Sequence, residues 1–227
     1  GGAPSDVKAE QRRFMGRVCA WMSGGLALTG VVALWVASQP ALVMAIATNR
    51  LLFYGLLLAE LAAVFAFAPI ARRASATVAA GVFLFYAALN GVTFSLIFLI
   101  YTTGSIASTF FVAGGTFAAM SVYGLVTRRD LSGMGRFMMM GLFGLIIAGV
   151  VNIFLRSDVV SWVSACVGVL VFSGLTAYHA QKIQAMNVLG NEGTDEDRKE
   201  AISGALVLYL DFINLFLSLL RLLGRRR

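Results

Sequence analysis

Seven apolar runs, each close to 20 residues long, constrain this chain more than any other feature of its sequence. A run of about 18 or more residues with little charge predicts a membrane helix, because about 20 residues rising about 1.5 Å each cross the hydrocarbon layer. We therefore expect an all-α integral membrane protein, folded as a bundle of seven transmembrane helices. The runs cover residues 18–38, 51–70, 78–101, 106–126, 137–155, 159–181 and 201–220.

The composition agrees with a membrane protein and argues against a soluble domain. Hydrophobic residues make up 59% of the chain and charged residues only 13%, whereas soluble domains carry about a quarter charged residues. The net charge of +7 comes from short Lys and Arg clusters that flank the apolar runs. We interpret them as topology signals. The expected partner is the lipid bilayer, and no nucleic-acid partner is expected.

The chain divides into a polar segment at 1–17, one transmembrane bundle at 18–222 and a basic tail at 223–227. The first run is longer than the apolar core of a signal peptide and lacks a clear cleavage site, so we interpret it as a retained span. Twelve Lys and Arg residues fall on the side of segment 1–17, against two on the other side before the last run. The positive-inside rule therefore predicts a cytoplasmic N-terminus.

The last run and the polar stretch before it pose a topological question. If 201–220 spans fully, it places Arg221 and the arginines at 225–227 on the outside, against the rule. The run either spans despite this or re-enters and returns. The preceding stretch, 187–200, is rich in charge and has no apolar periodicity, so it predicts a solvated loop.

Only two acidic residues lie within the apolar runs, Glu60 and Asp211. An ionised Asp at a helix centre costs about 2.5–3.5 kcal/mol on insertion scales, so each is a candidate site residue. The alternative is that each is protonated and bonds a neighbouring helix. The only histidine, His179, lies at the interfacial end of the sixth run, where imidazole titrates near neutral pH. Coupled to Asp211, it would titrate with that residue as one unit.

Catalytic motifs are missing from the sequence. One histidine cannot supply a His-rich zinc site, and there is no nucleophile elbow, P-loop or dinucleotide-binding fingerprint. We expect no enzymatic activity and no cofactor.

The residues around Asp211 carry a long and specific resemblance. Leu208–Phe216 (LYLDFINLF), followed by Leu219–Gly224 (LLRLLG), resembles the C-terminal signature of the Bax inhibitor family, the transmembrane Bax-inhibitor-motif proteins, in its bacterial YccA-like branch. Asn90–Thr102 and Arg129–Gly135 are similar to further family stretches. The resemblance covers nearly the whole chain.

This resemblance implies a seven-helix bundle with the last helix central and a pH-sensitive calcium leak channel of the bacterial inner membrane. In the family, an acidic residue on each of the last two helices forms a proton sensor. Asp211 matches the sensor acid of the last helix, and Glu60 matches a second-helix glutamate of the ion path. Asp211 and Glu60 are then a candidate weak calcium site, with calcium the transported ion. Arg72 or Arg73 matches an arginine that latches the closed state.

The chain departs from the family at position 179, where His replaces the common Asp. An imidazolium attracts Asp211 and repels both calcium and the latch arginine. We therefore expect weaker calcium binding than in relatives with two acids, and a pH response set by histidine. Two rival functions remain. Some similar proteins restrain a membrane-anchored ATP-dependent protease, and segment 1–17 would then be the contact. The other rival is a structural bundle without transport.

Overall fold

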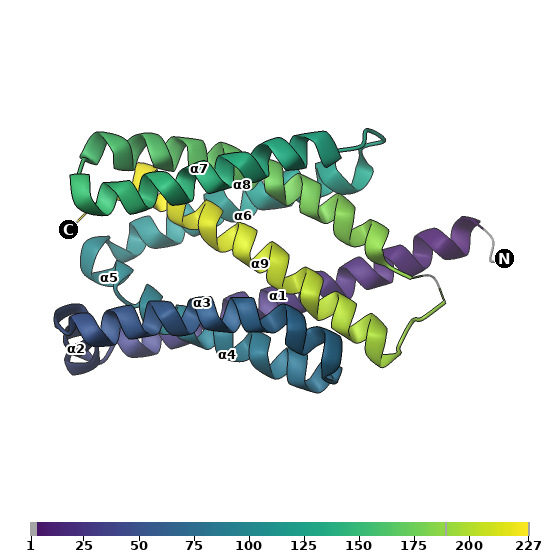
Figure 1. Ribbon diagram of the computed structural model, residues 1–227, viewed down its shortest axis with the longest axis horizontal. Helices are drawn as coiled ribbons and strands as arrows, with labels where there is room; N and C mark the ends of the chain where they lie inside the picture. Colours follow the sequence, from purple (N-terminus) through teal and green to yellow (C-terminus); the bar gives the residue numbers. More distant parts are fainter. Residues whose placement is uncertain (1–3, 189, 227) are drawn as a thin grey trace. The chain divides into compact units, whose positions relative to one another are not determined.

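The computed structural model describes residues 4–188 and 190–226, with side chains from residue 7 onward within these ranges. Residues 1–3 of the predicted N-terminal segment and residue 227 of the tail lie outside the described residues. Within these ranges, seven helical spans are long and apolar enough to cross a membrane, and each contains or overlaps one predicted run. Figure 1 labels their helices. They are α1 (Pro4–Ala37), α3 (Arg50–Arg73), α4 (Ala76–Phe94) with α5 (Ile97–Ile100), α6 (Thr103–Val126), α7 (Ser132–Leu155), α8 (Asp158–Met186) and α9 (Asp195–Leu223).

Three details differ from the sequence prediction. Helix α1 already begins at Pro4, because Phe14 and Val18 are fully buried and hold the polar segment in helical register. A short helix that the prediction missed, α2 (Pro40–Thr48), follows α1 and has a proline in its first turn. The third span is interrupted after Phe94, where the buried Ser95 hydroxyl bonds the Val92 carbonyl and competes with the backbone pattern.

Helix α9 answers the question about the last apolar run. It is continuous from Asp195 to Leu223, so it has no break at which the chain could turn back, and the re-entrant alternative is wrong. The Thr194 hydroxyl accepts from the Asp197 backbone N–H at 3.2 Å and caps the helix. Three acidic residues in the first turn favour the same start, because a helix N-terminus attracts negative charge. In the most apolar part of α9, 61% of residues are buried, the highest share among the spans, as expected for a central helix.

The chain forms two compact units, and α9 contributes to both. Unit 1 contains the described residues of 1–100 and 186–209, with α1 to α5 and the first part of α9. Its glycines let helices α1 and α4 approach closely: a Cβ added at Gly25 would lie 2.5 Å from the Phe83 ring. Tyr209 of α9 is fully buried there, with its hydroxyl 2.7 Å from the Thr29 hydroxyl of α1. Small residues and one polar contact thus fix the interior of unit 1.

Unit 2 contains the described residues of 101–185 and 210–227, with α6, α7, α8 and the second part of α9. A Cβ added at Gly124 of α6 would lie 2.1 Å from the Ala177 carbonyl oxygen of α8. One added at Gly168 of α8 would lie 2.5 Å from the Ser218 hydroxyl of α9. The helices therefore approach one another closely at these glycines. Membrane helices commonly pack in this way, because the surrounding lipid is as apolar as their side chains and the hydrophobic effect does not drive them together. This close packing sets the spacing of α8 from α9.

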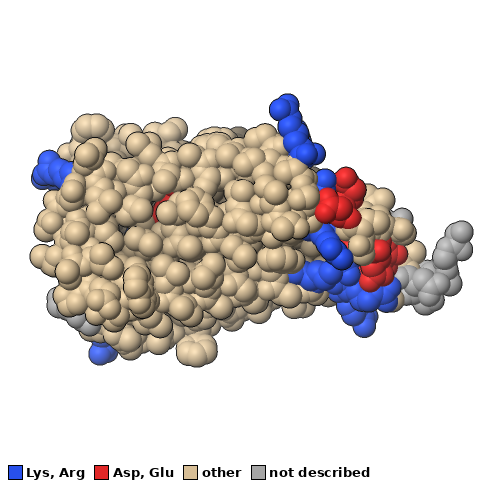
Figure 2. All heavy atoms as spheres, turned by 90° about the horizontal axis from the view of Figure 1, so that it is seen from below, with Lys and Arg blue, Asp and Glu red and all other residues tan. Residues whose placement is uncertain are grey.

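The outward faces of the spans are apolar. Leu51 of α3 and Phe154 of α7 expose 84% and 82% of their surface, values that soluble helices avoid for large apolar side chains. On the face drawn in Figure 2, atoms of uncharged residues cover most of the surface. Such surface is stable only in contact with lipid or another apolar partner. The chain is a multi-pass membrane protein.

Candidate functional site

The structure brings together two of the predicted site residues, His179 and Asp211, inside unit 2. His179 lies about two turns before the end of α8, and Asp211 lies near the middle of α9. The His179 Nδ1 atom is 2.7 Å from the Asp211 Oδ2 atom. Their side chains are 18% and 6% exposed. A hydrogen bond this short between a titratable ring and a buried carboxyl is geometrically suited to sharing or exchanging a proton.

The charge of this pair depends on its proton count. With one proton between them, imidazole and carboxyl carry no net charge, whichever group holds it. Losing that proton leaves one negative charge, and gaining a second leaves one positive charge. Either change is costly where water is largely excluded, so the surrounding helices must respond by moving, hydrating the pair or binding a counter-ion. The pair is therefore a chemically plausible element for coupling pH to helix packing.

Close aromatic packing fixes the surroundings of the pair within unit 2. The Tyr178 ring lies 5.2 Å from the His179 ring and tilted by 47°. The residue that follows Asp211 on α9, Phe212, makes edge contacts with Phe110 and Phe117 of α6. These rings limit the rotamers open to their neighbours on α8 and α9. The hydrogen-bonded geometry of His179 and Asp211 is thus supported from both helices.

Glu60 lies in unit 1 and makes a different contact. It is half-buried on α3, and one carboxylate oxygen accepts a short hydrogen bond from the Thr93 hydroxyl of α4. The bond joins two neighbouring membrane helices, as the alternative from the sequence expects, but its donor is Thr93, so it does not require Glu60 to be protonated. Its assignment to an ion path stays a prediction.

The two candidate latch arginines also belong to unit 1. Arg72 and Arg73 occupy the last turn of α3, one turn beyond Pro69, and both are exposed. A basic last turn is favourable by itself, because the C-terminal end of a helix carries partial negative charge. Which of the two acts as a latch stays a prediction.

Calcium ligation also stays a prediction. Glu60 and Asp211 belong to different units. Within residues 4–188 and 190–226, the structure contains no group of three or more His, Cys, Asp and Glu side chains suited to hold a metal ion. The prediction of a weak calcium site therefore depends on Glu60 and Asp211 as separate carboxylates.

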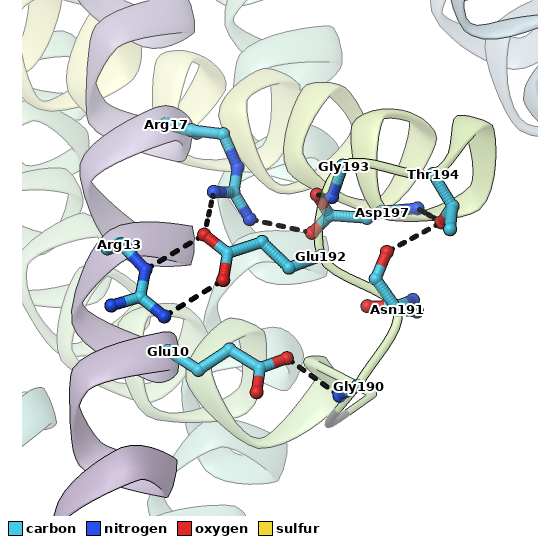
Figure 3. Close-up of polar contacts among 9 residues, drawn as sticks. All are labelled: Glu10, Arg13, Arg17, Gly190, Asn191, Glu192, Gly193, Thr194 and Asp197. Carbon is cyan, nitrogen blue, oxygen red and sulfur yellow. Dashed lines mark hydrogen bonds and ion pairs between the residues drawn. The ribbon is translucent and has the colours of Figure 1, made fainter.

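Sequence reasoning missed an ionic cluster in unit 1, between α1 and the loop before α9 (Figure 3). We call Arg13, Arg17, Glu192 and Asp197 the loop cluster. Arg13 donates to both oxygens of Glu192, at 2.8 and 2.9 Å, and Arg17 donates to Asp197 at 2.8 Å. Asp197 also accepts from the Gly193 backbone N–H at 3.0 Å. The paired arginines hold the pKa of Glu192 below its usual range.

The loop cluster corrects the prediction that 187–200 is a solvated loop. Residues from Asp195 onward are helical, and Asp197 is only 1% exposed. The available signal was the spacing of Arg13 and Arg17, which places both on one face of a helix. Their acidic partners lie at least 175 residues away in the chain, so charge pattern alone could not identify them.

The family model described as "Inhibitor of apoptosis-promoting Bax1" matches residues 11–227. The inner membrane protein YbhL of Escherichia coli (strain K12) is 46% identical over 221 residues, which cover 97% of this chain and 94% of YbhL. A protein of Deinococcus radiodurans is 44% identical over 211 residues, covering 93% of this chain and 90% of the relative. A protein of Borreliella burgdorferi is 42% identical over 217 residues, covering 96% and 94%.

Proposed function

The chain belongs to the Bax inhibitor family of membrane proteins, and from this premise we propose that it is a pH-sensitive cation leak channel of the inner membrane, with calcium as the transported ion. One observation carries the proposal: the buried hydrogen bond between His179 on α8 and Asp211 on α9. It joins two side chains of titratable type, an imidazole and a carboxyl group, within apolar helices. No catalytic step forms part of the proposal.

The proposed gate works through the charge of the pair. While one proton is shared, the pair is neutral and the helices pack in a closed arrangement. As pH rises and the proton leaves, the remaining negative charge favours hydration and the approach of a cation, which biases the helices toward an open arrangement. Helix α3 is the element that moves, with Glu60 lining the path and Arg72 or Arg73 latching the closed state. Flux should therefore increase with pH.

Histidine at position 179 changes this gate relative to two carboxylates. For any given number of bound protons, a His–Asp pair is one charge more positive than an Asp–Asp pair. It holds calcium less well, because less negative charge faces the ion. The pair then serves as a proton sensor more than as an ion-binding site.

The test is calcium flux into proteoliposomes that contain the purified protein, compared with Asp211→Ala. The proposal expects flux above that of empty liposomes in wild type and loss of its pH-dependent part in Asp211→Ala. Asn214→Ala is the matched control, because Asn214 lies one turn further along α9 and its amide bonds only the Leu210 carbonyl of its own helix among the contacts described. Absence of flux above empty liposomes in wild type would overturn the proposal.

The same preparations test restraint of a membrane-anchored ATP-dependent protease, the second candidate. The observation that favours it is that segment 1–17 is helical from Pro4, which presents an ordered surface to a partner. This function expects co-purification with the protease and its loss when residues 1–17 are trimmed. It also expects Asp211→Ala to leave co-purification unchanged.

A further inference from the structure

Unit 2 contains a basic hollow that the proposed channel function does not use. It has a volume of about 420 Å³ and lies where the end of α6, the start of α7 and the last turns of α8 meet. Arg128 and Arg129 line it from the α6–α7 connection, and Lys182 lines it from α8. Tyr178 and Ser132 also line the hollow. The hollow is large enough for a phosphate group and the atoms that carry it.

The hollow has an excess of positive charge. Its three basic side chains are exposed at the rim, whereas the one carboxylate in its lining, Asp130, accepts from the Ser132 backbone N–H at 2.9 Å. That hydrogen bonding to Ser132 keeps the pKa of Asp130 below its usual range, so the carboxylate stays ionised and engaged with the α7 terminus. Two guanidinium groups and an ammonium group remain for an anion. Arg in particular forms paired hydrogen bonds to phosphate oxygens.

Side-chain contacts hold the basic segments in place. The Gln181 amide nitrogen donates to the Arg129 carbonyl, and its oxygen accepts from the Leu131 N–H, both at 2.9 Å. The α6–α7 connection is thereby fastened to α8 on both sides of Asp130. The Lys182 ammonium lies 5.7 Å from the centre of the Tyr178 ring, at a cation–π distance. These contacts hold the α6–α7 connection against α8 and so fix the shape of the hollow.

The position of the hollow relative to the apolar spans indicates what it binds. Arg128 comes two residues after the span Thr103–Val126, Ser132 begins the next span, and Lys182 lies in the last turns of Asp158–Met186. The basic groups thus lie at the ends of three membrane helices, at the depth of lipid headgroups. We propose that this hollow is a binding site for the phosphate group of an anionic phospholipid. Basic pockets between membrane helices recognise such headgroups through charge and phosphate hydrogen bonds.

The experiment measures lipid binding by the full chain, purified in a neutral detergent, using native mass spectrometry. Phosphatidylglycerol is compared with phosphatidylcholine of the same acyl chains, because both carry phosphate and only the first is anionic. The variant is Arg128→Gln with Arg129→Gln. The matched control is Arg225→Gln with Arg226→Gln, which removes the same two charges from adjacent exposed arginines after the end of α9.

Wild type should bind phosphatidylglycerol in preference to phosphatidylcholine. At about fivefold per cation removed, the Arg128/Arg129 variant should bind it about 25-fold more weakly, and the control should bind as wild type does. Equal losses in the variant and the control would overturn the proposal in favour of a general charge effect. Inorganic phosphate is added in a separate arm. If millimolar phosphate displaces the lipid, the site takes a soluble phosphate ion and the lipid assignment is wrong; if it does not, the lipid assignment stands.

Discussion

Two regions of the molecule pair a basic side chain with a carboxylate. They differ in how exposed the paired groups are and in whether the basic group can lose its charge. In unit 2, His179 and Asp211 form one contact between two apolar helices, with side chains 18% and 6% exposed. In unit 1, the loop cluster combines two arginines with two acids, and Arg13 and Glu192 remain 56% and 35% exposed. Arginine stays charged at all relevant pH values, whereas histidine titrates near neutrality. The loop cluster is therefore built to hold a loop, and the His179–Asp211 pair is able to change its charge.

Among the changes considered, replacing His179 by Asp is expected to have the largest effect, and the property affected is the calcium affinity of the pair. It creates two carboxylates, so the pair gains negative charge at every pH at which both acids ionise. Calcium should then bind at least about tenfold more tightly, because one extra unit charge about 4 Å from a divalent ion contributes about 2 kcal/mol even at the dielectric constant of water, and about 1.4 kcal/mol corresponds to tenfold. Calcium titration by calorimetry measures the affinity.

The control for that variant is Asn152→Asp, which adds a carboxylate to unit 2 at the end of α7. The Asn152 side-chain oxygen accepts from the Ser157 N–H, a bond that Asp retains. Its calcium affinity should match that of wild type. An unchanged affinity in His179→Asp would contradict the interpretation of position 179.

Replacing Asp197 by Asn tests the structural role of the loop cluster. Asp197 is 1% exposed and bonds both Arg17 and the Gly193 N–H, so the change removes the negative charge from this contact and leaves Arg17 with its longer ion pair to Glu192 alone. We expect the free energy of unfolding to fall by about 1–3 kcal/mol, with no change in the pH dependence of flux. Thermal unfolding in detergent provides the first measurement.

Asp158→Asn is the matched control, because Asp158 is an exposed acid in the first turn of α8, as Asp197 is a buried acid in the first turn of α9. It should leave the unfolding temperature close to that of wild type. If both variants lose the same stability, helix-terminal charge explains the loss and the contact to Arg17 does not.

The smallest expected effect comes from Glu192→Gln. Because the folded-state pKa of Glu192 lies below the ordinary value of 4.5, the stabilisation it provides is complete above that pH and is lost as pH falls through the lowered value. Wild type should be slightly more stable than the variant near neutral pH, and the two should converge in acid. High salt should also reduce the difference, since the groups are exposed. If the stability difference between wild type and Glu192→Gln grew as pH fell, the pKa of Glu192 would have to be raised in the folded state, which would contradict this prediction.

Much of the fold follows from patterns visible in the sequence. The seven spans were predictable because hydrocarbon requires long apolar runs, and the resemblance around Asp211 predicted the family and a central last helix. The break at Ser95 and the helix Pro40–Thr48 were missed, because each depends on one or two local hydrogen bonds or on packing within unit 1. Apolar runs report burial in lipid and do not report such local detail.

The candidate site was predictable only in part. Glu60 and Asp211 stood out because charge is expensive within apolar helices, and the resemblance placed His179 at the position of the second sensor acid. The contact of Arg13 with Glu192 had no such signal, because two clusters of ordinary charged residues 179 positions apart do not specify each other.

The most direct test of the central claim is the pH profile of calcium flux in proteoliposomes for wild type and Asp211→Asn. Asn keeps the size and hydrogen-bonding capacity of Asp and cannot titrate, so it separates charge from packing. The account predicts that wild-type flux rises between about pH 6 and about pH 8, and that Asp211→Asn does not keep this profile, because the coupling between the two groups is broken. A variant that kept the wild-type profile would contradict the account and leave Asp211 as a structural hydrogen-bonding residue.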